Sequence, residues 1–176
     1  SLKKTSVQTF GHFVEYGETG VAYRPTMYDI LVHEAIAFYS TPELETAPEN
    51  PFHVTADSPA FGGVSAFLSW VPENIDAPEA KVIRLFQDLI RFHENDEDPS
   101  AYADADLARI TWAGNAAVGN AVGERLENAL QKFISNWNTH EISALARNAL
   151  AEHWKENKPE EARTLALEGA EAFPES

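Results

Sequence analysis

The stretch that decides the fold is residues 141–173, EISALARNALAEHWKENKPEEARTLALEGAEAF. Two runs with helical periodicity, 141–155 and 159–173, flank the short link 156–158, so we expect the helices to fold back on each other as an antiparallel hairpin. Pro174 closes the second helix, because proline cannot continue it. Small residues fall where such a pair would touch: Ala144, Ala149, Ala162, Ala166, Gly169 and Ala170.

Small contact residues, a tight turn and a terminal proline are typical of a tetratricopeptide-type repeat. The match is partial, because Ala149-Leu150 and His153-Trp154 stand where that repeat usually has its aromatic and Leu-Gly positions. A helix predicted over 118–135 fits the second half of a preceding, degenerate repeat. The predicted fold class is therefore all-α, with stacked antiparallel helical hairpins in a tetratricopeptide-like superhelix, and with the hairpins over 118–176.

Three more helices are predicted upstream, over 23–39, 78–93 and 100–112, from apolar residues at three- and four-residue steps. Thr26 and Asp29 have the spacing of a capping box at the start of the first. Residues 41–77 are rich in proline and glycine, and we expect a long irregular insertion there with a short helical turn over 64–70. We expect residues 1–176 to form a single helical domain, which we interpret as a fragment of a larger protein because it opens without an initiator Met.

The charge balance restricts the partners. Lys and Arg total 13 against 28 Asp and Glu, which gives a formal net charge of −15. Nucleic-acid binding begins with the neutralisation of phosphates by cationic side chains, so we expect no nucleic-acid partner. An acidic chain is also repelled by anionic membrane surfaces, and no apolar run approaches the ~18 residues of a membrane span, so we expect no direct membrane insertion.

The candidate chemical groups give no complete motif. His33-Glu34 resembles the start of a zinc-protease motif, but the required second histidine would fall at position 37, which is Ala37. No two of the six histidines have helical ligand spacing, and a long-range cluster of His33 with His93 and nearby acids is the remaining route to a metal. The absence of Cys excludes disulfides and thiolate ligands. We therefore expect no catalytic residue, no cofactor and no metal ligand.

Arg147 and Asn148 are the candidate partner-binding residues. A peptide-binding repeat presents Asn, Lys or Arg side chains on the concave face of its superhelix. These two residues lie in the first helix of the C-terminal hairpin, which would line such a face.

Two segments carry a family resemblance. YRPTMYDILVHEAIAFY (23–39), followed by AKVIRLFQDLIRFHENDEDPSAYADADLARI (80–110), resembles the helical region in the N-terminal part of large bacterial alpha-2-macroglobulin-like proteins. Met27 stands where Leu would be usual, and the order and spacing agree over roughly residues 21–173. The resemblance implies a protease trap of the bacterial envelope, in which a protease cleaves a bait region and is then enclosed. Many members form a Cys–Gln thioester, which this chain cannot carry because it has no Cys.

The sequence leaves three hypotheses about the function of this chain. The first is a non-catalytic scaffold or interaction domain of an alpha-2-macroglobulin-like protease inhibitor in the periplasm or cell envelope, with other domains of the parent chain and proteases or other proteins as partners. The alternative is a free-standing tetratricopeptide-like module that binds peptides or proteins. The third is a hydrolase whose acids and histidines converge across the insertion, which would require a pocket with perturbed titratable groups.

Overall fold

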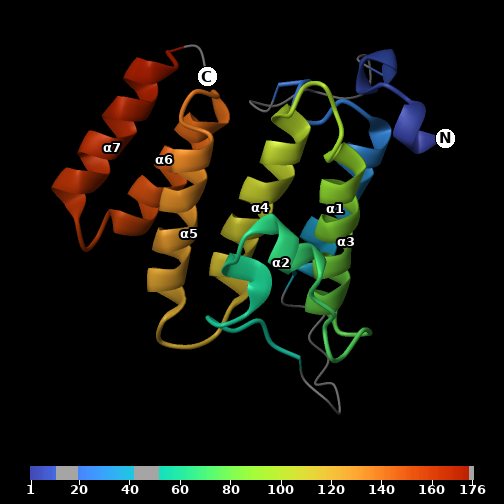
Figure 1. Ribbon diagram of the computed structural model, residues 1–176, viewed down its shortest axis with the longest axis horizontal. Coiled ribbons are helices and arrows are strands. Elements are labelled where there is room, and N and C mark those ends of the chain that lie inside the picture. Colours follow the sequence, from blue (N-terminus) through green and yellow to red (C-terminus); the bar gives the residue numbers. More distant parts are fainter. Residues whose placement is uncertain (11–19, 42–51, 175–176) are drawn as a thin grey trace. The chain divides into compact units, whose positions relative to one another are not determined.

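The computed structural model describes residues 1–10, 20–41 and 52–174, which form seven α-helices with short 3-10 helices and turns between them (Figure 1). Within these three ranges there is no β-strand, only two isolated bridges, Ser6–Thr26 and Thr55–Val118. The all-α class predicted from the sequence is confirmed. No helix in the described part of the chain is long and apolar enough to cross a bilayer.

The chain divides into two compact units. The first unit comprises Ser1–His53 and Phe67–Asp106, and the second comprises Val54–Ala66 and Leu107–Ser176. Helix α4 (Ser100–Ala116) begins in the first unit and ends in the second. The single helical domain expected over residues 1–176 stays a prediction.

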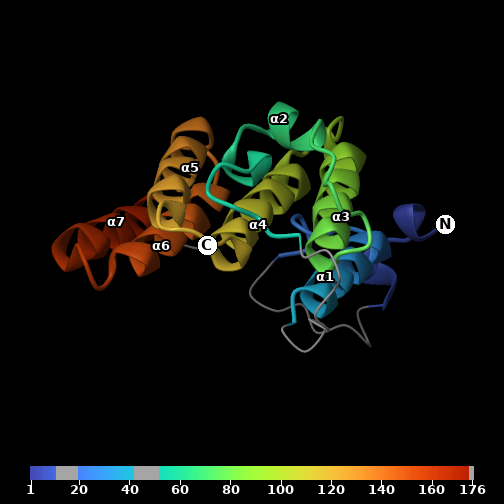
Figure 2. The same cartoon turned by 90° about the horizontal axis from the view of Figure 1, so that it is seen from below.

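In the first unit, α1 (Met27–Tyr39) packs against α3 (Pro78–His93) (Figure 2). Both helices begin as their sequences predict, α1 with a capping box and α3 with proline in its first turn, where the missing N–H has no helical partner to lose. Buried apolar side chains on both helices contribute to the core of this unit. From α3 these are Ala80, Val82, Ile83, Phe86, Leu89 and Ile90.

The N-terminal residues attach to the start of α1. Two short 3-10 helices, η1 (Leu2–Lys4) and η2 (Val7–Phe10), lie on either side of two backbone hydrogen bonds. In these, Met27 N–H donates to the carbonyl of Thr5 at 2.9 Å and Val7 N–H donates to the carbonyl of Pro25 at 3.0 Å. The Lys3 ammonium lies 4.5 Å from the ring centroid of Tyr28 and 4.9 Å from that of Phe92, both cation–π distances.

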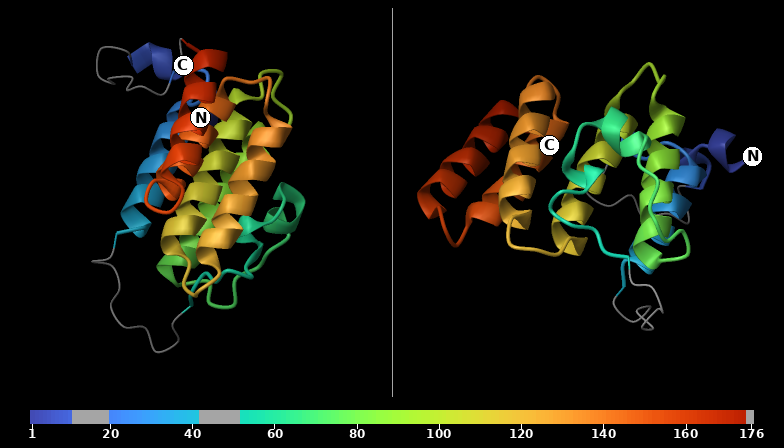
Figure 3. Two further views of the ribbon diagram at one scale, coloured as in Figure 1. Left: turned by 90° about the vertical axis from the view of Figure 1, so that its left-hand side faces the viewer. Right: turned by 60° about the horizontal axis from the view of Figure 1, so that its bottom comes forward.

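In the second unit, α5 (Val122–Asn136), α6 (Ile142–Trp154) and α7 (Pro159–Ala172) pack in chain order, α5 on α6 and α6 on α7 (Figure 3). Leu130, Phe133, Ile142 and Leu150 form its apolar centre and are almost fully buried. A Cβ built on Gly169 of α7 would lie 3.6 Å from Cα of Ala144 on α6, an ordinary van der Waals distance, so the two helices lie close together here and still leave room for a methyl group.

Three predicted boundaries are wrong by about a turn of helix. The helix expected over 23–39 begins at Met27, because Thr26 caps it in an extended conformation. The helix expected from residue 118 begins at Val122, because Val118 N–H donates to the carbonyl of Val54 at 2.9 Å and Gly119 has a φ of +117°, outside helical values. Helix α4 also continues beyond residue 112 to Ala116.

The insertion expected over 41–77 contains more regular structure than predicted. Residues 42–51 of it lie outside the described residues. The described remainder contains the 3-10 helix η4 (Pro59–Phe61) and the short helix α2 (Val64–Leu68), which agrees with the helical turn expected over 64–70.

Candidate functional site

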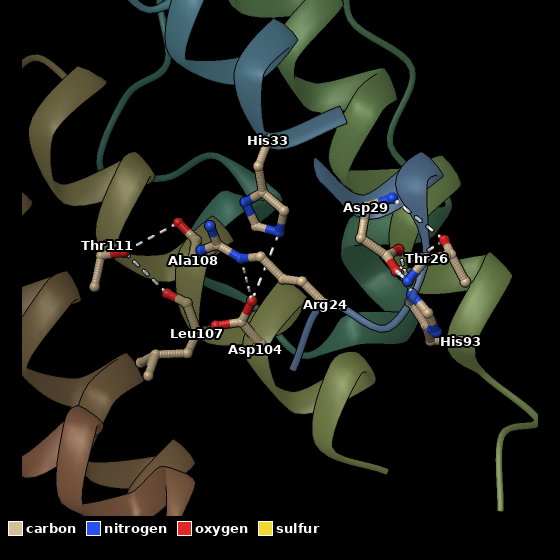
Figure 4. Close-up of polar contacts among 9 residues, drawn as sticks. All are labelled: Arg24, Thr26, Asp29, His33, His93, Asp104, Leu107, Ala108 and Thr111. Carbon is tan, nitrogen blue, oxygen red and sulfur yellow. Dashed lines mark hydrogen bonds and ion pairs between the residues drawn. The ribbon is translucent and has the colours of Figure 1, made fainter. Parts of the chain in front are cut away.

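A buried polar network lies in the first unit, around the first turns of α1 (Figure 4). Its members come from three separate parts of the sequence: the start of α1, the end of α3 with the turn that follows, and the start of α4. They are Arg24, Thr26, Asp29, His33, His93, Asp96 and Asp104. These residues lie in the segments 23–39 and 80–110, which carry the family resemblance. Their contacts therefore indicate whether the polar residues of these segments serve packing or chemistry.

Asp29 links the capping of α1 to α3. One carboxylate oxygen, Oδ2, accepts hydrogen bonds from the Thr26 backbone N–H at 2.7 Å and from the Thr26 hydroxyl at 2.9 Å. The Thr26 hydroxyl oxygen accepts from the Asp29 N–H at 3.4 Å, which completes the capping box predicted from the sequence. The other oxygen, Oδ1, lies 2.8 Å from Nε2 of His93. Burial opposes ionisation of Asp29, but the hydrogen bonds from His93 and Thr26 outweigh it and lower the pKa of this carboxyl.

His93 lies between two carboxylates. Its Nδ1 is 2.6 Å from Oδ2 of Asp96 and its Nε2 is 2.8 Å from Oδ1 of Asp29, while the residue is only 3% exposed. Burial by itself would lower the pKa of His93, but the hydrogen bonds to Asp29 and Asp96, together with their negative charges, raise it. The ring is therefore held in its charged form further into the neutral range than a free histidine.

His33 belongs to a second, looser group. Its Nε2 lies 3.6 Å from Oδ2 of Asp104, and Nε of Arg24 donates to the same oxygen at 3.3 Å. Burial, followed by the nearby charge of Arg24, lowers the pKa of His33 to about 4. Burial raises the pKa of Asp104 despite the opposing effect of Arg24. At neutral pH the imidazole of His33 in this group is therefore neutral.

The chemistry available to this network is limited by its internal bonds. Both ring nitrogens of His93 and both carboxylate oxygens of Asp29 face protein partners, so none of these atoms presents a free lone pair or proton to a substrate. The structure does bring His33 and His93 into the same unit, as the long-range cluster requires. Even so, no group of three or more metal-binding side chains with suitable geometry occurs among the described residues. Of the incomplete His33-Glu34 motif, only His33 belongs to this network, whereas Glu34 is exposed.

The two candidate partner-binding residues have different environments. Arg147 is half-buried, and its Nη1 donates to the buried Ser143 hydroxyl at 2.7 Å. Its Cβ and Cδ also lie 3.6 Å from a Cβ built on Gly169, so the side chain is part of the contact between α6 and α7. Asn148 is exposed. A partner-binding role for this pair stays a prediction.

Two buried polar residues were missed from the sequence. Gln87 on α3 donates through Nε2 to the carbonyls of Phe67 and Trp70, both at 2.8 Å. Arg109 on α4 is 1% exposed and donates through Nη1 to the carbonyls of Ala60 at 2.7 Å and Gly62 at 3.1 Å. A polar residue in the apolar stripe of a helix is the signal that could have identified both, because a buried polar group requires a partner.

A cluster at the turn between α6 and α7 joins three helices of the second unit. Lys158, at the start of α7, has its ammonium 2.9 and 3.0 Å from the carboxylate oxygens of Glu127 on α5. The same ammonium lies 4.8 Å from the ring centroid of Trp154, at the end of α6. The hydrogen bond from Lys158 is the main reason that the pKa of Glu127 is lowered. This cluster fixes the tight turn that the sequence predicted.

Comparison of the chain with protein-family models, with curated proteins and with solved structures finds no match. The function therefore has to be argued from the residues and contacts described above.

Proposed function

We propose that this chain is a non-catalytic scaffold and interaction domain of a bacterial alpha-2-macroglobulin-like protease inhibitor of the cell envelope. One observation carries the proposal: the polar residues of the two resembling segments bond to each other inside the first unit. Arg24 pairs with Asp104, and Thr26 and His93 both bond to Asp29. Polar motif residues used in this way specify how helices pack, which is the role expected of a scaffold.

The finer architecture that we propose is a stack of antiparallel helical hairpins. The order of packing of α5, α6 and α7 supports it, since each helix of a hairpin stack contacts its neighbours in sequence. The contacts of Lys158 with Glu127 and Trp154 support it as well, because they join all three helices at one turn. A long insertion over 41–77 would then be an addition to this stack.

Exposed apolar side chains supply surfaces for neighbouring domains of a parent chain. On α1, Leu31 is 47% exposed and Phe38 is 57% exposed. They are seven residues apart and therefore lie on one face of the helix. In the second unit, Leu145 and Leu167 are exposed in the same way. Apolar groups on the outside of a scaffold are where other domains of the inhibitor, or a trapped protease, would make contact.

The competing peptide-binding module is less well supported. It needs Arg147 free to meet a ligand, whereas this guanidinium donates to Ser143 and its aliphatic part contacts α7. Asn148 by itself gives too little polar recognition for a peptide groove. We therefore propose the scaffold function in preference to the peptide-binding module.

The test uses the intact reading frame that contains this sequence. We expect β-sandwich macroglobulin domains downstream of it and trapping of an added protease by the full protein. We expect Leu31→Glu with Phe38→Glu to reduce trapping while the fold is kept, and the exposed neighbour Glu34→Gln to leave it unchanged. A reading frame without such domains, or hydrolysis of a peptide library by the isolated chain, would contradict the proposal.

A further inference from the structure

A histidine between two carboxylates joins separate parts of the first unit. His93 ends α3, Asp29 lies in the first turn of α1, and Asp96 follows α3 by three residues. The His93 side chain is 2% exposed and that of Asp29 is 1% exposed, so water does not compete for the bond between them. Each ring nitrogen faces a carboxylate oxygen. A ring that donates to both must carry both protons, which makes it an imidazolium.

We propose that the proton on His93 acts as a latch that holds α1 on α3, and that its loss at rising pH loosens the start of α1. A neutral imidazole has one N–H, so one of the two carboxylates would then face a nitrogen lone pair. Either Asp29 would become a buried carboxylate without its cationic partner, or the ring would lose Asp96 and with it the turn after α3. This inference is independent of the proposed function.

The effect reaches the helix start because of the second bond made by Asp29. The same carboxylate that meets His93 also accepts from the backbone N–H and hydroxyl of Thr26. Thr26 adjoins Met27, whose N–H donates to the carbonyl of Thr5, so the first turn of α1 also holds the N-terminal segment. A carboxylate that moves away from a neutral ring therefore weakens the cap and the attachment of that segment together.

Three of the groups around His93, which are His33, Tyr28 and Asp29, keep one charge state between pH 6 and 9. His33, with its pKa of about 4, is neutral across this range, and burial with the charges of Asp88 and Asp29 raises the pKa of Tyr28 above its usual 10.0. Asp29 keeps its charge because its pKa is lowered. The charged and titratable groups around His93 are Asp29 and His33 of α1, Asp96 after α3, Asp104 of α4, Arg24 before α1, and Tyr28 with Lys3 beside the Phe92 ring.

The direction of the pH effect follows from the raised pKa of His93. A folded-state pKa above the unfolded value of 6.5 gives stability that is fully present below 6.5 and is lost as pH rises through the folded-state pKa. Each unit by which the pKa is raised corresponds to about a tenfold change in the equilibrium constant for opening.

The experiment measures opening of α1 in the full chain by hydrogen–deuterium exchange between pH 6 and 9, with correction for the intrinsic exchange rate. The His93 ring is titrated by NMR in the same samples. Asp96→Asn removes one carboxylate from the ring and should fold, because the Asp96 side chain is 43% exposed. Asp88→Asn is the matched control, since it removes an equal charge from an exposed site on α3, the helix that ends at His93, where Asp88 lies 3.8 Å from Arg91.

We expect the wild-type ring to titrate above pH 6.5, with protection of residues 27–39 falling by up to about tenfold per pH unit between pH 6.5 and the midpoint of the ring, and staying level above that midpoint. Asp96→Asn should move both midpoints to lower pH together, and Asp88→Asn should leave them in place. A ring that titrates at or below 6.5, opening of α1 that does not follow the ring, or equal shifts in the two variants would each overturn the latch. His93→Gln gives a second check, because its α1 opening should lose the pH dependence.

Discussion

Asp29 should be a sensitive position in the first unit, because a single carboxylate holds both the cap of α1 and the bond to α3. Asp29→Asn keeps the size of the side chain but removes its charge. The amide oxygen can still accept from the backbone of Thr26, as the carboxylate does at 2.7 Å. His93 is left with one carboxylate in place of two, at a site where Asp29 is only 1% exposed.

The size of the effect can be worked out from these contacts. Removal of one partner from a buried ion pair typically destabilises a protein by about 3–5 kcal/mol. His93 keeps its bond to Asp96 at 2.6 Å, so we expect the lower end, about 3 kcal/mol. Thr26→Ala removes the capping hydroxyl but leaves the bond between Asp29 and His93, so it should cost about 1 kcal/mol. We therefore predict that Asp29→Asn lowers the free energy of unfolding about three times as much as Thr26→Ala does.

The assay is urea unfolding at pH 7 and in acid, with exchange of α1 amides to locate the change. Because the pKa of Asp29 is lowered, its contribution is present above the unfolded value of 3.8 and is lost as pH falls through the folded-state pKa. The difference between wild type and Asp29→Asn should therefore shrink in acid. A loss no larger than that of Thr26→Ala, or a difference that stays constant down to the lowest pH at which the chain folds, would refute the reasoning.

Three further predictions concern single contacts. His33 has a pKa of about 4 in place of 6.5, so stability present above pH 6.5 should fall by up to ~3 kcal/mol as pH drops to 4, and His33→Gln should flatten this dependence in urea titrations. Gln87→Leu removes the side-chain donor of the Trp70 and Phe67 carbonyls, of which Phe67 keeps the Trp70 N–H at 3.1 Å, and should cost about 1–3 kcal/mol, against less than about 0.5 for the exposed Arg84→Leu on the same helix. Gly169→Ala places its Cβ no closer than 3.6 Å to its neighbours and should raise stability by about 0.5–1 kcal/mol, and a loss of stability would contradict this.

The elements that sequence predicted well are those fixed by nearby residues. The capping box of Thr26 and Asp29, and the proline starts of α3 and α7, depend on residues within one turn of helix. The start of α5 was predicted too early because Val118 bonds to Val54, a contact between residues far apart in the chain. Periodicity does not report such contacts.

The buried network was recognised only in part. His33 and His93 could be selected as a long-range pair, but nothing in the sequence indicates that Asp29 and His93, 64 residues apart, share a hydrogen bond. The same limit applies to Gln87 and Arg109, whose partners are backbone carbonyls and therefore carry no side-chain signature. Arg147 looked available for a partner because the sequence could not reveal its contact with Ser143.

Gln87 and Arg109 have a consequence for how this protein can diverge. Each anchors a short segment through main-chain oxygens, those of Phe67 in α2 and of Trp70 after it in one case, and those of Ala60 in η4 and of Gly62 after it in the other. Every amino acid supplies such an oxygen, so the exposed side chains of these segments are free to change over generations while the anchors are not. We expect related proteins to keep a glutamine and an arginine at these helical positions, while the sequences of the anchored segments diverge.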